Sequence, residues 1–185
     1  MRLSREIKIT LLKLARKTIE EKLFGKSSIE VKDDFAELNE ICGVFVTLHK
    51  KGELRGCIGN IIGTYPLLEG VSRMALASAF EDPRFVALSE REYPEIDIEI
   101  TVLSPLCQAS AEKVEVGRHG VFISRGYNKG VLLPQVATEH DMDRETFLSQ
   151  TCLKAGLHKD CWKDKNTKIE TFTGDVFSEK ELLSP

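Results

Sequence analysis

The sequence predicts an α+β fold: a mostly antiparallel sheet with helices packed on it. Three observations lead to this prediction. Residues 4–24 and 67–80 place apolar side chains at helical spacing. Two apolar runs, residues 43–48 and 54–59, are separated by a short polar turn, which is typical of a β-hairpin. Residues 96–102 alternate isoleucine or valine with polar side chains, the pattern of a half-buried strand.

The elements between these follow in chain order. Gly25 is expected to end the first helix, and residues 29–40 to be irregular or a short helix. The alanine-rich second helix should end at Asp82-Pro83, because the residue before a proline is biased away from helical conformation.

The C-terminal half predicts further hairpins and one helix. The hairpins span residues 114–133, with a first strand at 114–116 and turns rich in glycine and asparagine. Asp143 can cap a helix over residues 144–155, and residues 168–177 alternate loosely as a last strand. No repeat or linker interrupts the 185 residues, which therefore suit a single domain over residues 1–185 or two tightly packed lobes.

The most informative stretch is the second strand of the hairpin, Leu54-Arg55-Gly56-Cys57-Ile58-Gly59-Asn60. In an extended strand Arg55, Cys57 and Gly59 share one face, which places a guanidinium beside a thiol. An adjacent arginine favours the thiolate, and its planar guanidinium suits a carboxylate or phosphate. Glycine inside a strand often marks the close approach of a ligand or another backbone, so Gly56 and Gly59 are candidates for the floor of a binding site.

The same residues also have a structural interpretation. Arg55 can be half of an ion pair, Cys57 a small packed side chain, and the two glycines turn or bulge residues. If Arg55 and Glu99 lie on neighbouring strands, a cross-strand ion pair is expected. The functional alternative makes Glu99 a general base beside Cys57 or a group that orients a ligand.

Three further places are candidates for function. His119 lies between two near glycines and can transfer a proton or bind an anion, although a lone histidine in a turn is more often only exposed surface. Gln135 can offer its amide to a ligand or satisfy buried backbone groups. Asp82 and Arg84 are expected to form a local structural pair rather than a catalytic one.

Several motifs together resemble one known family. Residues 43–48 followed by 54–59 are similar to the hallmark of the AMMECR-type domain, which in bacteria and archaea is called AmmeMemoRadiSam system protein A. The resemblance continues through four motifs: Ala79–Phe85, Ile98–Pro105, Leu132–Val136 and Lys154–Leu157. It covers residues 40–177 and departs at Asp141-Met142, where the family commonly has Gly-Trp. The resemblance implies a two-part α+β domain with a cleft, which cooperates with a Memo-like protein and a radical SAM enzyme.

Composition argues against several classes of protein. A net charge of −3 is unsuited to a general nucleic-acid binder, which neutralises phosphates with clustered lysine and arginine. No apolar stretch resembles a signal peptide or is long enough to span a bilayer, so we expect a cytoplasmic protein without membrane attachment. Five cysteines, an odd number without an export signal, are expected to be reduced thiols.

The sequence predicts no metal site and no cofactor. Cys152, His158 and Cys161 match none of the usual zinc spacings, and a fourth ligand is missing. Phosphate-binding loop, dinucleotide-binding and serine-nucleophile patterns are also absent from the sequence.

Two functions fit these features. The first is an enzyme or enzyme component that binds or modifies a small anionic molecule in the cleft, with Arg55 as anchor, Cys57 as nucleophile or proton donor, and Glu99 or His119 as base. The second is a non-catalytic adaptor that binds a protein with the same face of Arg55 and Cys57. We favour the first.

Overall fold

The computed structural model describes residues 3–25 and 35–183 of the chain. These residues divide into two compact units, of which the first runs to Leu103 and resumes at Asp175, and the second comprises Ser104–Gly174. Each unit has its own four-stranded sheet and its own apolar core. The second unit is thus an insertion into the chain of the first, and the predicted α+β fold class is confirmed.

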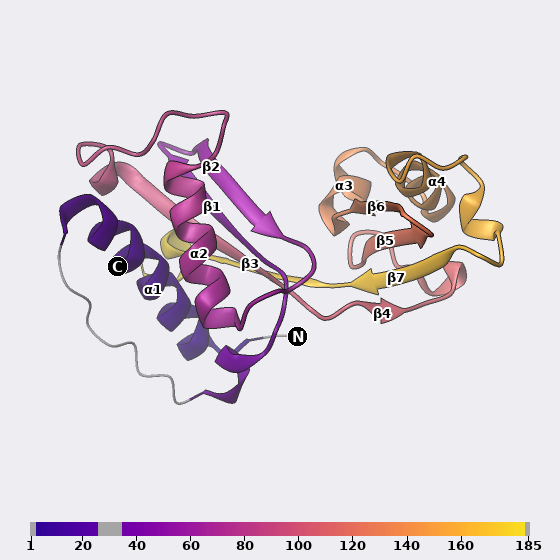
Figure 1. Cartoon of the computed structure of the whole chain (residues 1–185), viewed down its shortest axis with the longest axis horizontal. Helices are drawn as coiled ribbons and strands as arrows, with labels where there is room; N and C mark the ends of the chain where they lie inside the picture. Colours follow the sequence, from indigo (N-terminus) through magenta and orange to yellow (C-terminus); the bar gives the residue numbers. More distant parts are fainter. Residues whose placement is uncertain (1–2, 26–34, 184–185) are drawn as a thin grey trace. The chain divides into compact units, whose positions relative to one another are not determined.

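In the first unit two helices pack against the sheet (Figure 1). The helices are α1 (Arg5–Phe24) and α2 (Leu67–Phe80), and the strands, in spatial order, are β2 (Glu53–Asn60), β1 (Val44–Lys50), β3 (Ile96–Leu103) and β8 (Gly174–Ser178). The short elements are η1 (Ala36–Asn39), η2 (Tyr93–Glu95) and α5 (Glu179–Leu182). The hydroxyl of Ser4 caps α1 by accepting the N–H of Ile7, and Gly25 ends it in the left-handed conformation, as predicted.

The two faces of this first sheet differ. Val46, Leu48 and Ile98 are completely buried in the core that α1 and α2 complete. Thr47 and Glu99 belong to the opposite face and are half-buried. The alternation of the sequence therefore separates a core face from a polar face, and the polar face carries the candidate site.

The second unit packs two helices on its sheet. The strands, in spatial order, are β4 (Cys107–Gln108), β7 (Lys168–Phe172), β5 (Gly120–Arg125) and β6 (Asn128–Leu132). The helices are α3 (Pro134–Glu139), α4 (Arg144–Lys154) and the single turns η3 (Ala111–Lys113) and η4 (Cys161–Lys163). Asp143 caps α4 as predicted, by accepting the N–H of Thr146.

The structure differs from the sequence prediction in three elements. Residues 114–116 form no strand, because the amides of Arg118 and His119 turn back to the carbonyl of Glu115. Residues 168–177 form two strands, β7 and β8, in different sheets. At Leu133 the chain enters α3, since Pro134 suits the first turn of a helix.

Three other predictions concern residues 29–40, the arrangement of the two lobes, and membrane-spanning helices. Residues 29–34 of the segment expected to be irregular or a short helix lie outside the described residues, and η1 is the helical turn in its remainder. The tight packing of two lobes around a cleft stays a prediction. No helix within residues 3–25 and 35–183 combines the length and the apolar character needed to cross a bilayer.

Candidate functional site

The candidate site is built on β2, the edge strand of the first sheet. Gly56 pairs with Leu48 and Leu54 pairs with His49, so Arg55 is an extra residue in a β-bulge. After the bulge Cys57 lies opposite Thr47 of β1.

Thr47 in turn lies opposite Glu99 of β3, so three side chains form a row across three strands. The hydroxyl of Thr47 donates a hydrogen bond to Sγ of Cys57 at 3.2 Å, and Cys57 is a half-buried free thiol. The carboxylate of Glu99 makes no hydrogen bond or ion pair with the described residues, and the two intervening strand spacings put the Glu99 backbone roughly 10 Å from that of Cys57. Glu99 therefore shares the face of the thiol without touching it.

The segment that follows α2 covers the outer edge of β2. Buried Asp82 accepts the N–H of Cys57 at 2.8 Å, and its carboxylate is bidentate with Arg84, Oδ1 to Nε at 3.0 Å and Oδ2 to Nη2 at 2.7 Å. Arg84 also donates to the carbonyl of Cys57 at 3.2 Å. The expected pair of Asp82 and Arg84 is confirmed, and it satisfies backbone groups that an edge strand would otherwise expose.

This pair also brings charge to the thiol. The hydrogen bond from Arg84 outweighs the effect of burial and holds the pKa of Asp82 well below its usual range, so the carboxylate stays ionised. The guanidinium of Arg84 is half exposed and interacts electrostatically with Cys57. No hydrogen bond among the described residues uses its Nη1, which leaves one donor of this guanidinium unused.

Arg55 has a different position from the one predicted. Its guanidinium is 8% exposed and forms a bidentate pair with Glu92, Nε to Oε1 at 3.0 Å and Nη2 to Oε2 at 3.1 Å, while Nη2 also donates to the carbonyl of Val86 at 2.9 Å. The hydrogen bonds from Arg55 lower the pKa of Glu92 to about 2, with burial opposing and Lys50 and Ser89 assisting.

The condition for an ion pair of Arg55 with Glu99 is not met, because β1 lies between β2 and β3. The structural interpretation of Arg55 as half of an ion pair is confirmed, with Glu92 as its partner. The guanidinium that bonds to Cys57 and acts on its thiol is that of Arg84. The Nη1 atom of Arg55 is shielded from solvent and without a hydrogen-bond partner among the described residues, and the role of Arg55 as an anion anchor stays a prediction.

The two glycines admit neighbouring groups. A Cβ at Gly56 would lie 2.2 Å from the carbonyl oxygen of Ser78 in α2, and one at Gly59 would lie 2.3 Å from the ring of Phe45. The hydroxyl of buried Ser78 then links the two strands, since it donates to the carbonyl of Val46 and accepts the N–H of Ile58. Close approach of another backbone is thus what Gly56 provides, and a binding role for either glycine stays a prediction.

Comparison with known proteins identifies the family. The family model described as AMMECR1 matches residues 12–177. This chain belongs to the AMMECR1 family. A protein of Methanothermobacter thermautotrophicus is 42% identical over 185 residues, covering 96% of each chain, and one of Nanoarchaeum equitans is 42% identical over 92% of this chain and 99% of its own.

A solved structure from the same family has the same fold. The crystal structure of the uncharacterized protein PH0010 from Pyrococcus horikoshii aligns with a TM-score of 0.76 at 41% identity and covers 95% of this chain and 92% of its own. The names of these relatives state no activity, so the chemistry of this AMMECR1-family protein has to be argued from its own residues.

The remaining candidates lie on the second unit. His119 is half-buried, and its Nδ1 accepts the N–H of Glu115 at 3.2 Å within a turn. Gln135 is exposed on α3. Their roles as base and as ligand-binding amide stay predictions.

Two residues of the site were not among the predicted functional residues. Thr47 has no signal of its own in the sequence, since only the register of β1 with β2 shows that it faces Cys57. Arg84 does have a signal, because it lies in the Ala79–Phe85 motif that resembles the AMMECR1 family.

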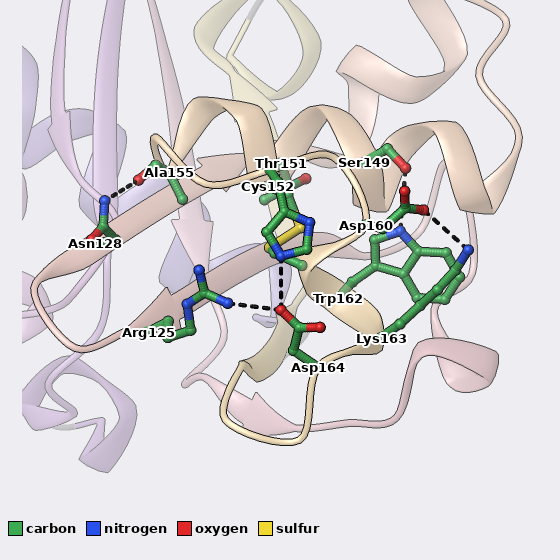
Figure 2. Close-up of a disulfide and its surroundings, with 12 residues drawn as sticks. Arg125, Asn128, Ser149, Thr151, Cys152, Ala155, Asp160, Trp162, Lys163 and Asp164 are labelled. Carbon is green, nitrogen blue, oxygen red and sulfur yellow. Dashed lines mark hydrogen bonds and ion pairs between the residues drawn. A yellow bond between two sulfur atoms is a disulfide. The ribbon is translucent and has the colours of Figure 1, made fainter.

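The cysteine prediction needs a correction. Cys152 and Cys161 form a disulfide, while Cys42, Cys57 and Cys107 are free (Figure 2). The end of α4 and the start of η4 bring the two Cα atoms within 5.9 Å, which is inside the range that a disulfide can join. The bond takes both cysteines out of any metal site, and among the residues that the structure describes no cluster of three or more His, Cys, Asp or Glu is arranged to hold a metal.

Proposed function

We propose that this protein is a component of an enzyme system that binds a small anionic molecule at the β2 edge and uses the thiol of Cys57 as nucleophile or proton donor. The observation that carries the proposal is the free thiol with the Thr47 hydroxyl at 3.2 Å and the Arg84 guanidinium beside it. Reactive cysteines are found in partly exposed positions close to a cationic side chain, whereas structural ones are buried and inert.

Each neighbour of Cys57 has a distinct part in the proposal. Arg84 takes the role of anion anchor through its free Nη1, because a half-exposed guanidinium can meet a carboxylate or phosphate. Asp82 is a positioning residue that orients Arg84 by bidentate bonding. Glu99 would act as base on a substrate that lies across Thr47, since it makes no contact with the thiol itself.

Arg55 has an indirect part in this proposal. Through Glu92 and the carbonyl of Val86 it fastens the segment that follows Asp82 and Arg84 to β2. A loss of Arg55 would therefore displace Arg84 without removing a group that touches the substrate.

Family membership supports the partners in the proposal. The AmmeMemoRadiSam name implies that the chain acts with a Memo-like protein and a radical SAM enzyme. A tagged chain expressed with both proteins from one genome is expected to retain them on an affinity column, and recovery of neither would contradict this part of the proposal.

A trapping experiment tests the thiol. Wild-type protein, Cys57→Ala and the matched control Cys107→Ala are incubated with a small-molecule extract and analysed by intact-protein and peptide mass spectrometry. The proposal expects an adduct on Cys57 in the wild type and in Cys107→Ala, and none in Cys57→Ala. Adducts confined to exposed Cys107 would count against it.

A second candidate function is an adaptor that binds a protein at the same edge. Two exposed apolar side chains favour it: Leu54 is 43% exposed and Val86 is 82% exposed, and both flank Arg55. If the protein is an adaptor, Leu54→Glu and Val86→Glu should abolish partner capture, and Cys57→Ala should leave it intact. The enzyme proposal expects Cys57→Ala to remove the adduct while partner capture persists.

A further inference from the structure

A pocket of about 460 Å³ opens on the second unit, and none of its lining residues belongs to the proposed thiol site. It lies between the loop that follows β4 and the loop that leads into β7, and its lining includes Ser110, Ala111, Trp162, Lys165, Thr167 and Ile169. Its volume is within the range of about 300–1,000 Å³ that small-molecule sites occupy.

One wall of the pocket is fixed by a covalent bond and three polar contacts (Figure 2). The disulfide between Cys152 and Cys161 ties the start of this wall to α4, and the neighbouring Trp162 donates its indole N–H to Ser149 at 3.2 Å. Asp164 accepts hydrogen bonds from Arg125 at 2.7 Å and pairs with His158 at 2.8 Å. The wall is therefore preorganised, as binding sites for small molecules usually are.

The charges of the lining leave one cation without a partner. Asp164 already pairs with Arg125 and His158, and Lys163 pairs with Asp160 at 3.0 Å. Hydrogen bonds from its own backbone N–H and from Ser110 lower the pKa of Glu112 and so engage its carboxylate. Lys165 lines the pocket, is exposed, and has no ion pair within the described residues. A ligand that complements the pocket therefore carries negative charge.

The rest of the lining suits a ring. Trp162 is half-buried and lines the pocket, and the ammonium of Lys163 covers its indole, with Nζ 4.7 Å from the ring centre. The lysine stem is flexible, and an entering ring can shift the ammonium toward the ligand's own anionic group. Ile169 adds apolar surface.

Thr167 provides an independent observation. Its Oγ1 is shielded from solvent and has no hydrogen-bond partner among the described residues, although it belongs to the pocket lining. Buried hydroxyls in native proteins are normally hydrogen-bonded, and rotation about the Cα–Cβ bond can turn this one toward a polar group in the pocket.

We propose that this pocket is a binding site for a small aromatic anion, whose ring stacks on Trp162 and whose anionic group pairs with Lys165. The site is distinct from the thiol site and does not depend on it. Nucleoside monophosphates and aromatic carboxylic acids both have this chemistry.

The test uses the full chain with AMP and phenylacetate as probes. Adenosine, which has the ring without the anionic group, and ribose 5-phosphate, which has the anionic group without the ring, are the controls. Trp162 is the only tryptophan of the chain, so its fluorescence reports on this pocket, and calorimetry gives the affinity. We expect AMP or phenylacetate to change the emission saturably and to bind more tightly than adenosine or ribose 5-phosphate. The tighter of the two probes decides between nucleotides and aromatic acids.

Three variants locate the binding. Lys165→Ala removes an exposed side chain without disturbing the fold and should weaken binding about tenfold. Lys129→Ala, at an exposed lysine of β6 outside the pocket, and Cys57→Ala should leave it unchanged. The proposal would be overturned if AMP and phenylacetate both fail to bind at about 10 mM. It would also be overturned if Lys165→Ala and the wild type bind them with equal affinity. Because Cys57→Ala tests only the thiol site, failure of one proposal is distinguishable from failure of the other.

Discussion

The β2 edge of the first unit and the disulfide end of the second hold their chains in place by different means. At the β2 edge, hydrogen bonds and ion pairs of Asp82 and Glu92 fix the strand, and the thiol of Cys57 stays free. At the end of α4, a buried disulfide does the fastening, and both sulfurs are consumed by it. Polar contacts thus provide the local structure at the β2 edge and leave the sulfur of Cys57 unbonded, whereas at the end of α4 the two sulfurs provide it.

The largest expected effect tests the packing of the β2 edge. Gly56→Ala should lower the free energy of unfolding by about 3 kcal/mol or more, because the new methyl group would overlap the carbonyl of Ser78. Gly70→Ala in α2 is the matched control: its methyl group would meet Val44 at an ordinary 3.8 Å. We expect it to stabilise the protein by about 0.5–1 kcal/mol through helix propensity. Urea unfolding measures both, and a tolerated Gly56→Ala would contradict the described contact.

The next effect concerns the disulfide end. Replacing Cys152 and Cys161 together by serine should destabilise the second unit by about 2.7 kcal/mol, because the bond closes a loop of about ten residues. Hydrogen exchange read peptide by peptide should show faster exchange in residues 144–172 and no change in β1 and β2. Equal acceleration in both units would mean that they do not behave as separate regions.

A smaller effect tests the ion pairs that replace a covalent bond at the β2 edge. Glu92→Gln should cost about 2 kcal/mol at neutral pH, because Arg55 loses its charged partner. The folded-state pKa of Glu92, about 2, is below its ordinary value of 4.5, so the stability that this carboxylate contributes is present above pH 4.5 and is lost as the pH falls toward 2.

The variant should therefore lose less stability than the wild type between pH 4.5 and pH 2. Glu90→Gln, at an exposed position of the same segment, is the control and should follow the wild type. An acid dependence in Glu92→Gln identical to that of the wild type would show that the pair with Arg55 does not stabilise the edge.

Local sequence patterns predicted much of the fold. The periodicity of residues 4–24 and 96–102 and the cap at Asp143 predicted α1, β3 and α4, because these signals depend only on neighbouring residues. The division of residues 168–177 into two strands was not predictable in this way. It depends on Thr173, whose N–H and carbonyl bond to distant Ser104 instead of continuing a ladder.

The site was less predictable because it depends on pairing between strands. The bulge at Arg55 and the central place of β1 decide which side chains meet, and neither has a local signal. Alternation correctly put Cys57 on the face opposite Gly56, but the arginine at the thiol comes from a segment 27 residues along the chain. The disulfide was not predictable for the same reason, since only the fold brings Cys152 and Cys161 together.

We expect Cys57 to be an accessible thiol whose neighbour Arg84 attracts anions, and the rates of its alkylation test this directly. Rates with negatively charged iodoacetate and neutral iodoacetamide are measured for each free cysteine of the folded protein by mass spectrometry. Cys42 is the buried reference, because burial raises its pKa to about 11, and Cys107 is the exposed one.

We predict that Cys57 reacts while Cys42 does not. We also predict that the ratio of the iodoacetate rate to the iodoacetamide rate is higher for Cys57 than for Cys107, and that it falls in Arg84→Gln. An inert Cys57, or a ratio no higher than that of Cys107 and unchanged in Arg84→Gln, would contradict it.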